Sequence, residues 1–145
     1  MKTKNVYRLP IDRSRIGRIS YKESPAHVGP LRHSVDFIVT EDTPVKAALG
    51  GVVVDILDGS EIGGPQKKLE KYGNFVEIGH PNGEYSEYEH LRKGLLVKVG
   101  DRVKKGQLIG YSGATGWLAH LGPHLHFMVG VYNPKYETLK VVFEK

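Results

Sequence analysis

Hydrophobic residues along the chain alternate with polar ones over short stretches that end at glycine or proline. Residues 35–39, 45–49 and 52–56 are such stretches, and we predict that each forms a strand. The polar stretch 58–73 is predicted to be an inserted loop, with only weak helical periodicity at residues 66–72. This half of the chain therefore predicts short strands and one long connection.

A strong hairpin pattern lies in the middle of the chain, where Pro81-Asn82-Gly83 separates two alternating stretches, 74–80 and 84–90. A three-residue loop with Gly83 in the left-handed conformation fixes the register of the two strands. That register pairs Val76 with Tyr88, Ile78 with Ser86 and Asn74 with His90. It predicts that His90 shares a sheet face with Tyr88.

Further short strands, each broken at a glycine, are predicted within residues 96–103 and 105–112, and an apolar strand is predicted around 125–129. No segment carries helical periodicity over three turns. We therefore predict an all-β fold, a compact barrel-like sandwich of short antiparallel strands of the duplicated hybrid motif type. Residues 1–145 are predicted to form a single domain, with a motif-bearing core at about 26–129 and an N-terminal extension at 1–24.

The composition of the chain excludes some classes of binding partner and some kinds of metal site. The net charge is +5, but the lysines and arginines are scattered beside turns, so we do not expect nucleic-acid binding. No apolar run is long enough for a membrane span, and no apolar stretch follows the basic N-terminus, so no secretory signal is predicted. The protein is expected to be cytoplasmic as written, or secreted or periplasmic if a leader was removed. The chain has no cysteine, so any metal must be held by histidines and carboxylates.

The most informative local pattern is His124-Leu125-His126, which places two imidazoles one residue apart in an apolar strand. In an extended strand such residues point to the same face, about 7 Å apart. One ring can then ligate a metal while the other handles protons, although two half-buried core histidines would give the same pattern. A catalytic zinc needs three protein ligands and an open position, and Asp36 on the strand at 35–39 is a further candidate ligand.

Several ordered motifs accompany this histidine pair. They are Ser34-Val35-Asp36-Phe37, Tyr88-Glu89-His90-Leu91, Ser112-Gly113-Ala114-Thr115-Gly116 and Gly122-Pro123-His124-Leu125-His126. In this order the motifs resemble those of the lysostaphin-like zinc endopeptidases, which cut peptide cross-links of bacterial cell walls. The resemblance extends over residues 26–129. It implies peptidoglycan cross-links or glycine-rich peptides as substrate and one zinc ion per chain, and we expect a monomer.

The resemblance implies that His27, Asp36 and His126 hold the zinc. The family's familiar first motif, His-x-x-x-Asp, is not present, because Arg32 stands four residues before Asp36 and stays protonated. His27 begins a His-x-Gly segment nine residues before Asp36, which resembles a variant branch of the family. His33 is the competing ligand, but its odd spacing from Asp36 would point it to the opposite strand face.

The same resemblance assigns catalysis to His90 and His124, neither of which would bind the metal. Zinc would activate a water molecule, one histidine would take its proton, and the other would hydrogen-bond the oxyanion; the sequence does not decide which does which. Tyr88, Ser112 and Thr115 are predicted to contact substrate or to shape its groove. Among the remaining candidates, His80 is expected to be structural, His120 and Trp117 are candidates for the groove wall, and residues 1–24 are a candidate cover for the groove.

Two other functions fit parts of the pattern. A catalytically inactive relative would serve as a scaffold or regulator, and it would bind no zinc tightly. A phosphohistidine carrier module of similar fold would use His90 and His124 as facing histidines, without needing Asp36 or His126 as ligands. The function that we predict is a zinc metalloendopeptidase, and zinc content and phosphate transfer separate it from these alternatives.

Overall fold

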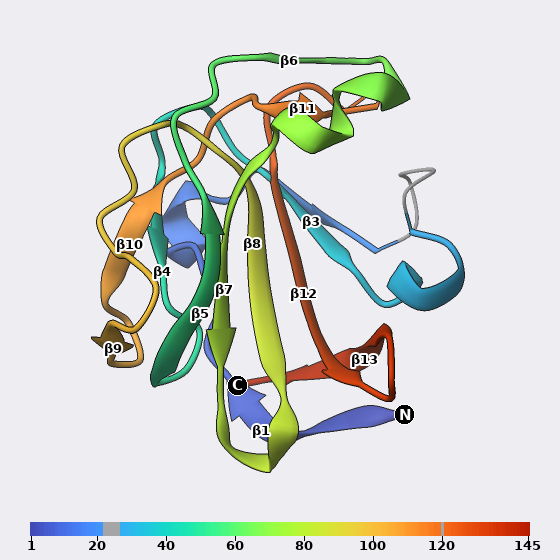
Figure 1. Ribbon diagram of the computed structural model, residues 1–145, viewed down its shortest axis with the longest axis vertical. Coiled ribbons are helices and arrows are strands. Elements are labelled where there is room, and N and C mark those ends of the chain that lie inside the picture. Colours follow the sequence, from blue (N-terminus) through green and yellow to red (C-terminus); the bar gives the residue numbers. More distant parts are fainter. Residues whose placement is uncertain (22–26, 120) are drawn as a thin grey trace.

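The computed structural model describes residues 1–21, 27–119 and 121–145. Within them, a curled nine-stranded sheet forms the body of the molecule (Figure 1). Its main path joins β1 (Lys2–Tyr7), β13 (Tyr136–Phe143), β12 (Leu125–Tyr132), β8 (Tyr85–Leu91), β7 (Asn74–Gly79), β5 (Gly51–Leu57) and β9 (Arg102–Val103). Branching from this path, β3 (Val35–Ile38) pairs with β12, and β2 (Arg18–Ser20) pairs with β3.

Two small strand pairs and four short 3-10 helices complete the described fold. The pairs are β4 (Pro44–Lys46) with β10 (Leu108–Tyr111), and β6 (Gly63–Gly64) with β11 (Gly116–Trp117). The 3-10 turns are η1 (Arg13–Arg15), η2 (Gly29–Leu31), η3 (Lys67–Tyr72) and η4 (Pro81–Gly83). The predicted all-β, barrel-like fold is confirmed, with parallel pairing for β1 with β13 and for β6 with β11.

Alternation along β8 and β12 places the core on one sheet face and polar side chains on the other. Tyr88 and Phe127 pair across these strands and are fully buried, with ring centroids 5.2 Å apart. Burying an aromatic side chain of this kind contributes about 2–3 kcal/mol. His126 precedes Phe127 and pairs with Asp36 of β3, so both point to the opposite face. The core therefore fixes the register that sets His126 against Asp36.

The predicted hairpin is confirmed near its turn, but the pairing predicted at the end farthest from the turn is wrong. Gly83 has a φ of 67°, and two predicted pairs are present, Val76 with Tyr88 and Ile78 with Ser86. Asn74, however, pairs with Leu91 rather than with His90. The reason is a β-bulge, in which His90 adopts a φ of 68° and is left out of the pairing. The bulge turns His90 away from the core face that Tyr88 occupies.

Local pattern predicts the position of most strands better than their length. The strands predicted at 45–49 and 96–103 shorten to β4 and β9 in the structure. The loop predicted at 58–73 contains β6 and η3, and η3 coincides with the weak helical periodicity. No helix among the described residues is long and apolar enough to cross a membrane.

The segment predicted as an N-terminal extension is built into the sheet and the core. β1 adds a parallel strand to β13, and Tyr7 and Ile11 are fully buried. The buried carboxyl group of Glu84 fastens this strand, because it accepts hydrogen bonds from Lys4 N at 2.6 Å, Asn5 N at 3.3 Å and Tyr7 Oη at 2.9 Å. The first strand therefore belongs to the fold rather than to an appendage.

Replacing Glu84 with alanine is expected to destabilise the protein by about 2–4 kcal/mol, because two backbone amides and a phenol lose a buried acceptor. Urea unfolding followed by circular dichroism measures the loss. The control is Glu137→Ala, which removes an exposed carboxyl group 3.6 Å from Arg32 and should cost less than about 0.5 kcal/mol. Equal losses in the two variants would contradict the role given to Glu84.

Candidate metal centre and active site

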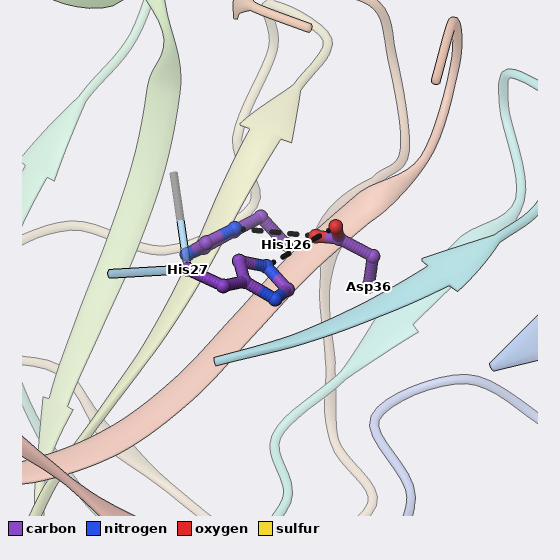
Figure 2. Close-up of side chains that lie close together, drawn as sticks. All are labelled: His27, Asp36 and His126. Atoms are coloured by element: carbon purple, nitrogen blue, oxygen red, sulfur yellow. Dashed lines mark ion pairs between the residues drawn. The ribbon is translucent and has the colours of Figure 1, made fainter. Parts of the chain in front are cut away.

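Three side chains from separate segments converge on the sheet face opposite the core, as Figure 2 shows. Asp36 on β3 pairs directly with His126 on β12, so the two side chains point the same way. His27, which lies shortly before η2, joins them. Its Nε2 lies 3.1 Å from Asp36 Oδ2, and His126 Nδ1 lies 3.2 Å from Asp36 Oδ1. One potential ligand atom from each residue lies within 4.8 Å of those of the other two.

The cluster is buried, and several of its polar atoms lack ordinary hydrogen bonds. Asp36 is fully buried, and neither of its oxygens nor His27 Nε2 has a partner in hydrogen-bonding geometry, although the ion-pair distances are short. Leaving such an atom buried and unpaired costs about 1–3 kcal/mol, and more for a charged group. A cation bound between these atoms would remove that cost. Two imidazoles and one carboxylate are also a donor set of catalytic zinc sites, so the residues fit such a metal.

The tautomer of His27 suits a metal ligand. Its Nδ1 lies 2.9 Å from the carbonyl oxygen of Tyr21, which can only accept, so Nδ1 carries the proton. Nε2 therefore keeps its lone pair and directs it toward Asp36. His33, the competing ligand, does not join the cluster; its backbone N–H donates to Thr138 Oγ1, and its side chain lines a separate pocket.

Two further imidazoles adjoin the cluster without belonging to it. The ring centroids of His90 and His124 lie 4.5 Å apart, and those of His90 and His126 lie 6.0 Å apart. The Nδ1 atoms of His90 and His124 each lie 2.7 Å from a carbonyl oxygen, that of Thr115 and that of Gly122 respectively. Both rings therefore donate from Nδ1 and keep a lone pair on Nε2. His124 Nε2 lies 3.5 Å from Asp36 Oδ1, so it faces the cluster.

Over most of its length the sequence matches a known protein family. Residues 31–137 match the model of peptidase family M23. The chain belongs to this family. Lysostaphin from Staphylococcus simulans is 41% identical to this M23 chain over 100 residues, which cover 68% of the chain and 18% of lysostaphin. The peptidoglycan DD-endopeptidase ShyA from Vibrio cholerae is 37% identical over 127 residues, which cover 83% of the chain and 26% of ShyA.

A solved structure extends the similarity to nearly the whole M23 chain. A zinc-containing peptidase from Vibrio cholerae aligns with 94% of the chain and 40% of its own length, with a TM-score of 0.66 and 29% identity. The resemblance to the lysostaphin-like family is thereby confirmed. The chain spans 18% to 31% of the length of these and further curated relatives.

Burial and neighbouring charges shift the pKa values of several groups in and beside this cluster. Burial, reinforced by the charges of His124 and His126, lowers the pKa of His90 to about 3. Burial also lowers the pKa of His124, while Asp36 opposes that shift. Burial alone would raise the pKa of Asp36, but contacts with His126 and His27 hold it well below its usual range. At neutral pH the site therefore offers His90 and His124 as neutral imidazoles beside the ionised carboxylate of Asp36.

The structure corrects the predicted substrate contacts of Tyr88 and Ser112. The Tyr88 side chain is fully buried, and its hydroxyl accepts hydrogen bonds from Ala48 N at 2.9 Å and Ser86 Oγ at 2.8 Å. The Ser112 hydroxyl is also buried, and it donates to the Thr40 carbonyl at 2.9 Å. Neither group is presented to a ligand, because the regular alternation of β8 turns Tyr88 into the core.

The third predicted contact, Thr115, is buried beside His90. Its hydroxyl donates to the Leu91 carbonyl at 2.7 Å, so this hydroxyl holds the neighbouring backbone in place. His80 is structural, as expected, since Nδ1 contacts the Gly50 carbonyl at 2.8 Å. His120 lies outside the described residues, so its predicted place in the groove wall stays a prediction.

A small pocket beside the metal cluster contains residues that the sequence did not single out. Glu70 and Glu89 line it together with His90, His126 and Trp117. Glu89 pairs with His126 across β8 and β12, which places its carboxyl group next to the site. Glu89 directly precedes His90, and two consecutive strand residues face the same way only because of the bulge. The alternation of polar and apolar residues along this strand therefore does not predict that Glu89 lines the same pocket as His90.

The low pKa of His90 predicts how the metal-free protein responds to acid. In the unfolded chain this imidazole binds a proton below about pH 6.5, whereas in the folded protein it stays neutral to about pH 3. The unfolded state therefore binds more protons between these values, and folding stability falls as the pH is lowered through this window. We expect His90→Gln to reduce the slope of stability against pH by up to about 1 kcal/mol per pH unit.

Urea unfolding of the metal-free protein at several pH values between 7.5 and 4 tests this expectation. At pH 7.5 the His90 imidazole is neutral in both the folded and the unfolded state. The difference in unfolding free energy between wild type and variant at this pH is therefore the reference. Parallel stability curves for wild type and variant across the window would show that burial does not depress the His90 pKa.

Proposed function

We propose that the chain is a zinc-dependent endopeptidase whose substrate is peptidoglycan cross-links or glycine-rich peptides. The observation that carries this proposal is the buried cluster of His27, Asp36 and His126, in which His27 Nε2 and both Asp36 oxygens lack hydrogen-bond partners and which lies beside two further imidazoles. The M23 family gives the reaction class, and the names of the relatives, lysostaphin and a peptidoglycan DD-endopeptidase, support the substrate class.

In this proposal His27, Asp36 and His126 hold the metal. A zinc ion bound there supplies a Lewis acid that lowers the pKa of a coordinated water from about 15.7 toward about 7. His27 keeps Nε2 free for ligation because its Nδ1 proton is donated to the Tyr21 carbonyl. Asp36 contributes the negative charge of the ligand set, and burial of the cluster excludes bulk water from it.

The two remaining imidazoles move the protons. His90 and His124 each present Nε2, since their Nδ1 protons are donated to backbone carbonyls. One of them accepts the proton of the attacking water at Nε2 and returns it to the leaving amine. The other would stabilise the oxyanion of the tetrahedral intermediate from Nε2 in its cationic form, which the negative charge developing on the substrate favours over the neutral form that burial favours in the free site. No covalent bond between enzyme and substrate is needed.

The alternative functions account for less of the site. A phosphohistidine carrier would use His90 and His124 but would leave the convergence of His27 and Asp36 unexplained. An inactive scaffold would have no use for five convergent side chains, three of which fit a metal.

Metal content tests the ligand assignment. We expect wild-type protein to bind one zinc ion per chain and His27→Ala to lose most of it, because one of three protein ligands is removed. His33→Ala is the matched control and should keep its zinc, since His33 lies outside the cluster. Zinc is measured by atomic emission after dialysis against a weak chelator. Zinc retained in His27→Ala and lost in His33→Ala would overturn the assignment.

Hydrolysis tests the proton-transfer pair separately from the metal. We expect His90→Ala to keep zinc and to lower kcat by about 10²–10⁴-fold on purified peptidoglycan, because the variant lacks one proton-transfer group. Release of new amino groups from the peptidoglycan measures the rate, and added chelator should abolish it in the wild type. A zinc-loaded wild type that releases no amines from peptidoglycan or glycine-rich peptides would refute the proposed activity.

A further inference from the structure

His90 reaches the site only because the backbone of β8 is distorted. Glu89 and His90 are consecutive and both line the pocket, while their neighbours Tyr88 and Leu91 are both fully buried in the core. A regular strand would turn one of the two pocket residues into the core. The bulge at His90, with its φ of 68°, removes that conflict.

This backbone conformation is unfavourable for a residue with a side chain, so neighbouring contacts must hold it. The carbonyl of His90 accepts a hydrogen bond from Gly113 N at 2.9 Å. The carbonyl of Leu91 accepts two, from Asn74 Nδ2 at 3.1 Å and from Thr115 Oγ1 at 2.7 Å. Asn74 N in turn donates to Thr115 Oγ1 at 3.0 Å. Asn74, Leu91 and Thr115 thus form a closed, buried set of hydrogen bonds directly beside the bulge.

Thr115 also fixes the ring itself. Its carbonyl oxygen lies 2.7 Å from His90 Nδ1, which places the proton on Nδ1 and the lone pair on Nε2. The following glycine allows this close approach, because a Cβ on Gly116 would lie 2.7 Å from Gly73 Cα and 3.3 Å from His90 Nδ1. One residue therefore holds the bulge with its hydroxyl and the imidazole with its carbonyl.

We propose that Asn74 and Thr115 are positioning residues for His90. Together they keep the bulge in place and set the ring with Nδ1 protonated and Nε2 directed to the reacting groups. The catalytic part of this statement rests on the proposed function, in which His90 moves a proton or binds the oxyanion. The structural part, a single tautomer held by these hydrogen bonds, is independent of any activity.

The test compares three variants of full-length protein. Thr115→Val removes the hydroxyl and keeps the side-chain shape, while Thr115→Ser keeps the hydroxyl. Thr3→Val is the matched control, because its buried hydroxyl also donates to a carbonyl, that of Asn5, and accepts from an amide, that of Val142, but lies on β1 away from the site.

Nitrogen-15 NMR of the imidazole rings gives a readout that does not depend on catalysis. We expect wild type, Thr115→Ser and Thr3→Val to show His90 as the single Nδ1–H tautomer, with a slowly exchanging Nδ1 proton. Thr115→Val should show a mixture of tautomers or a rapidly exchanging proton. An unchanged His90 spectrum in folded Thr115→Val would overturn the positioning role.

Kinetics on peptidoglycan give the second readout. We expect Thr115→Val to lower kcat by about 10–100-fold with KM little changed and zinc retained, as is usual for loss of a supporting hydrogen bond behind a functional histidine. Thr115→Ser should restore most of the rate, and Thr3→Val should match the wild type. An altered tautomer with an unchanged kcat would refute the catalytic part of the inference. If the wild type itself is inactive, the proposed function fails while the NMR result still decides the positioning role.

Discussion

The direct pairing of Asp36 with His126 across β3 and β12 is the constraint on which the site depends. The two residues face the same side because Phe37 and Phe127, one position further along each strand, are packed in the core. Their ligand atoms are therefore held together by the packing of the whole sheet rather than by bonds to each other. A buried carboxylate kept in place in this way is costly without a compensating positive charge, which a cation or a protonated imidazole beside it would supply.

Much of the fold follows from local pattern, because the strands around the core alternate regularly. The hairpin through Gly83 and the inward placement of Val76 and Ile78 need only the period of a strand and the geometry of a turn. Local sequence pattern does not predict β1 and β13, because regular apolar alternation is weak in this part of the fold. In β1 only Thr3 and Tyr7 are buried, so a sequence rich in lysine gives no apolar stripe, and its pairing with β13 depends on the opposite end of the chain.

Strand period in the sequence predicts one part of the candidate site, and the rest depends on contacts between segments that are distant in the sequence. His126 lies on the regular part of β12 and His124 directly precedes this strand, so their spacing alone indicates a pair of neighbouring rings. The bulge at His90 depends on Asn74 and Thr115, which are far from it in sequence. The residues around His90 alone therefore do not predict it. Regular alternation continued through His90 predicts that Tyr88 and His90 share a face, and it therefore predicts the substrate side for Tyr88, which is wrong because of the bulge.

The parallel strand β1 has a practical consequence for the dissection of this chain. The family match, residues 31–137, leaves out β1, β2 and most of β13. A fragment cut to those bounds would lack the core side chains of Tyr7 and Ile11 and would leave the C-terminal half of β12 with an open edge. Such edges are templates for intermolecular pairing, so a recombinant fragment trimmed to residues 31–137 would self-associate more readily than a chain that retains both ends.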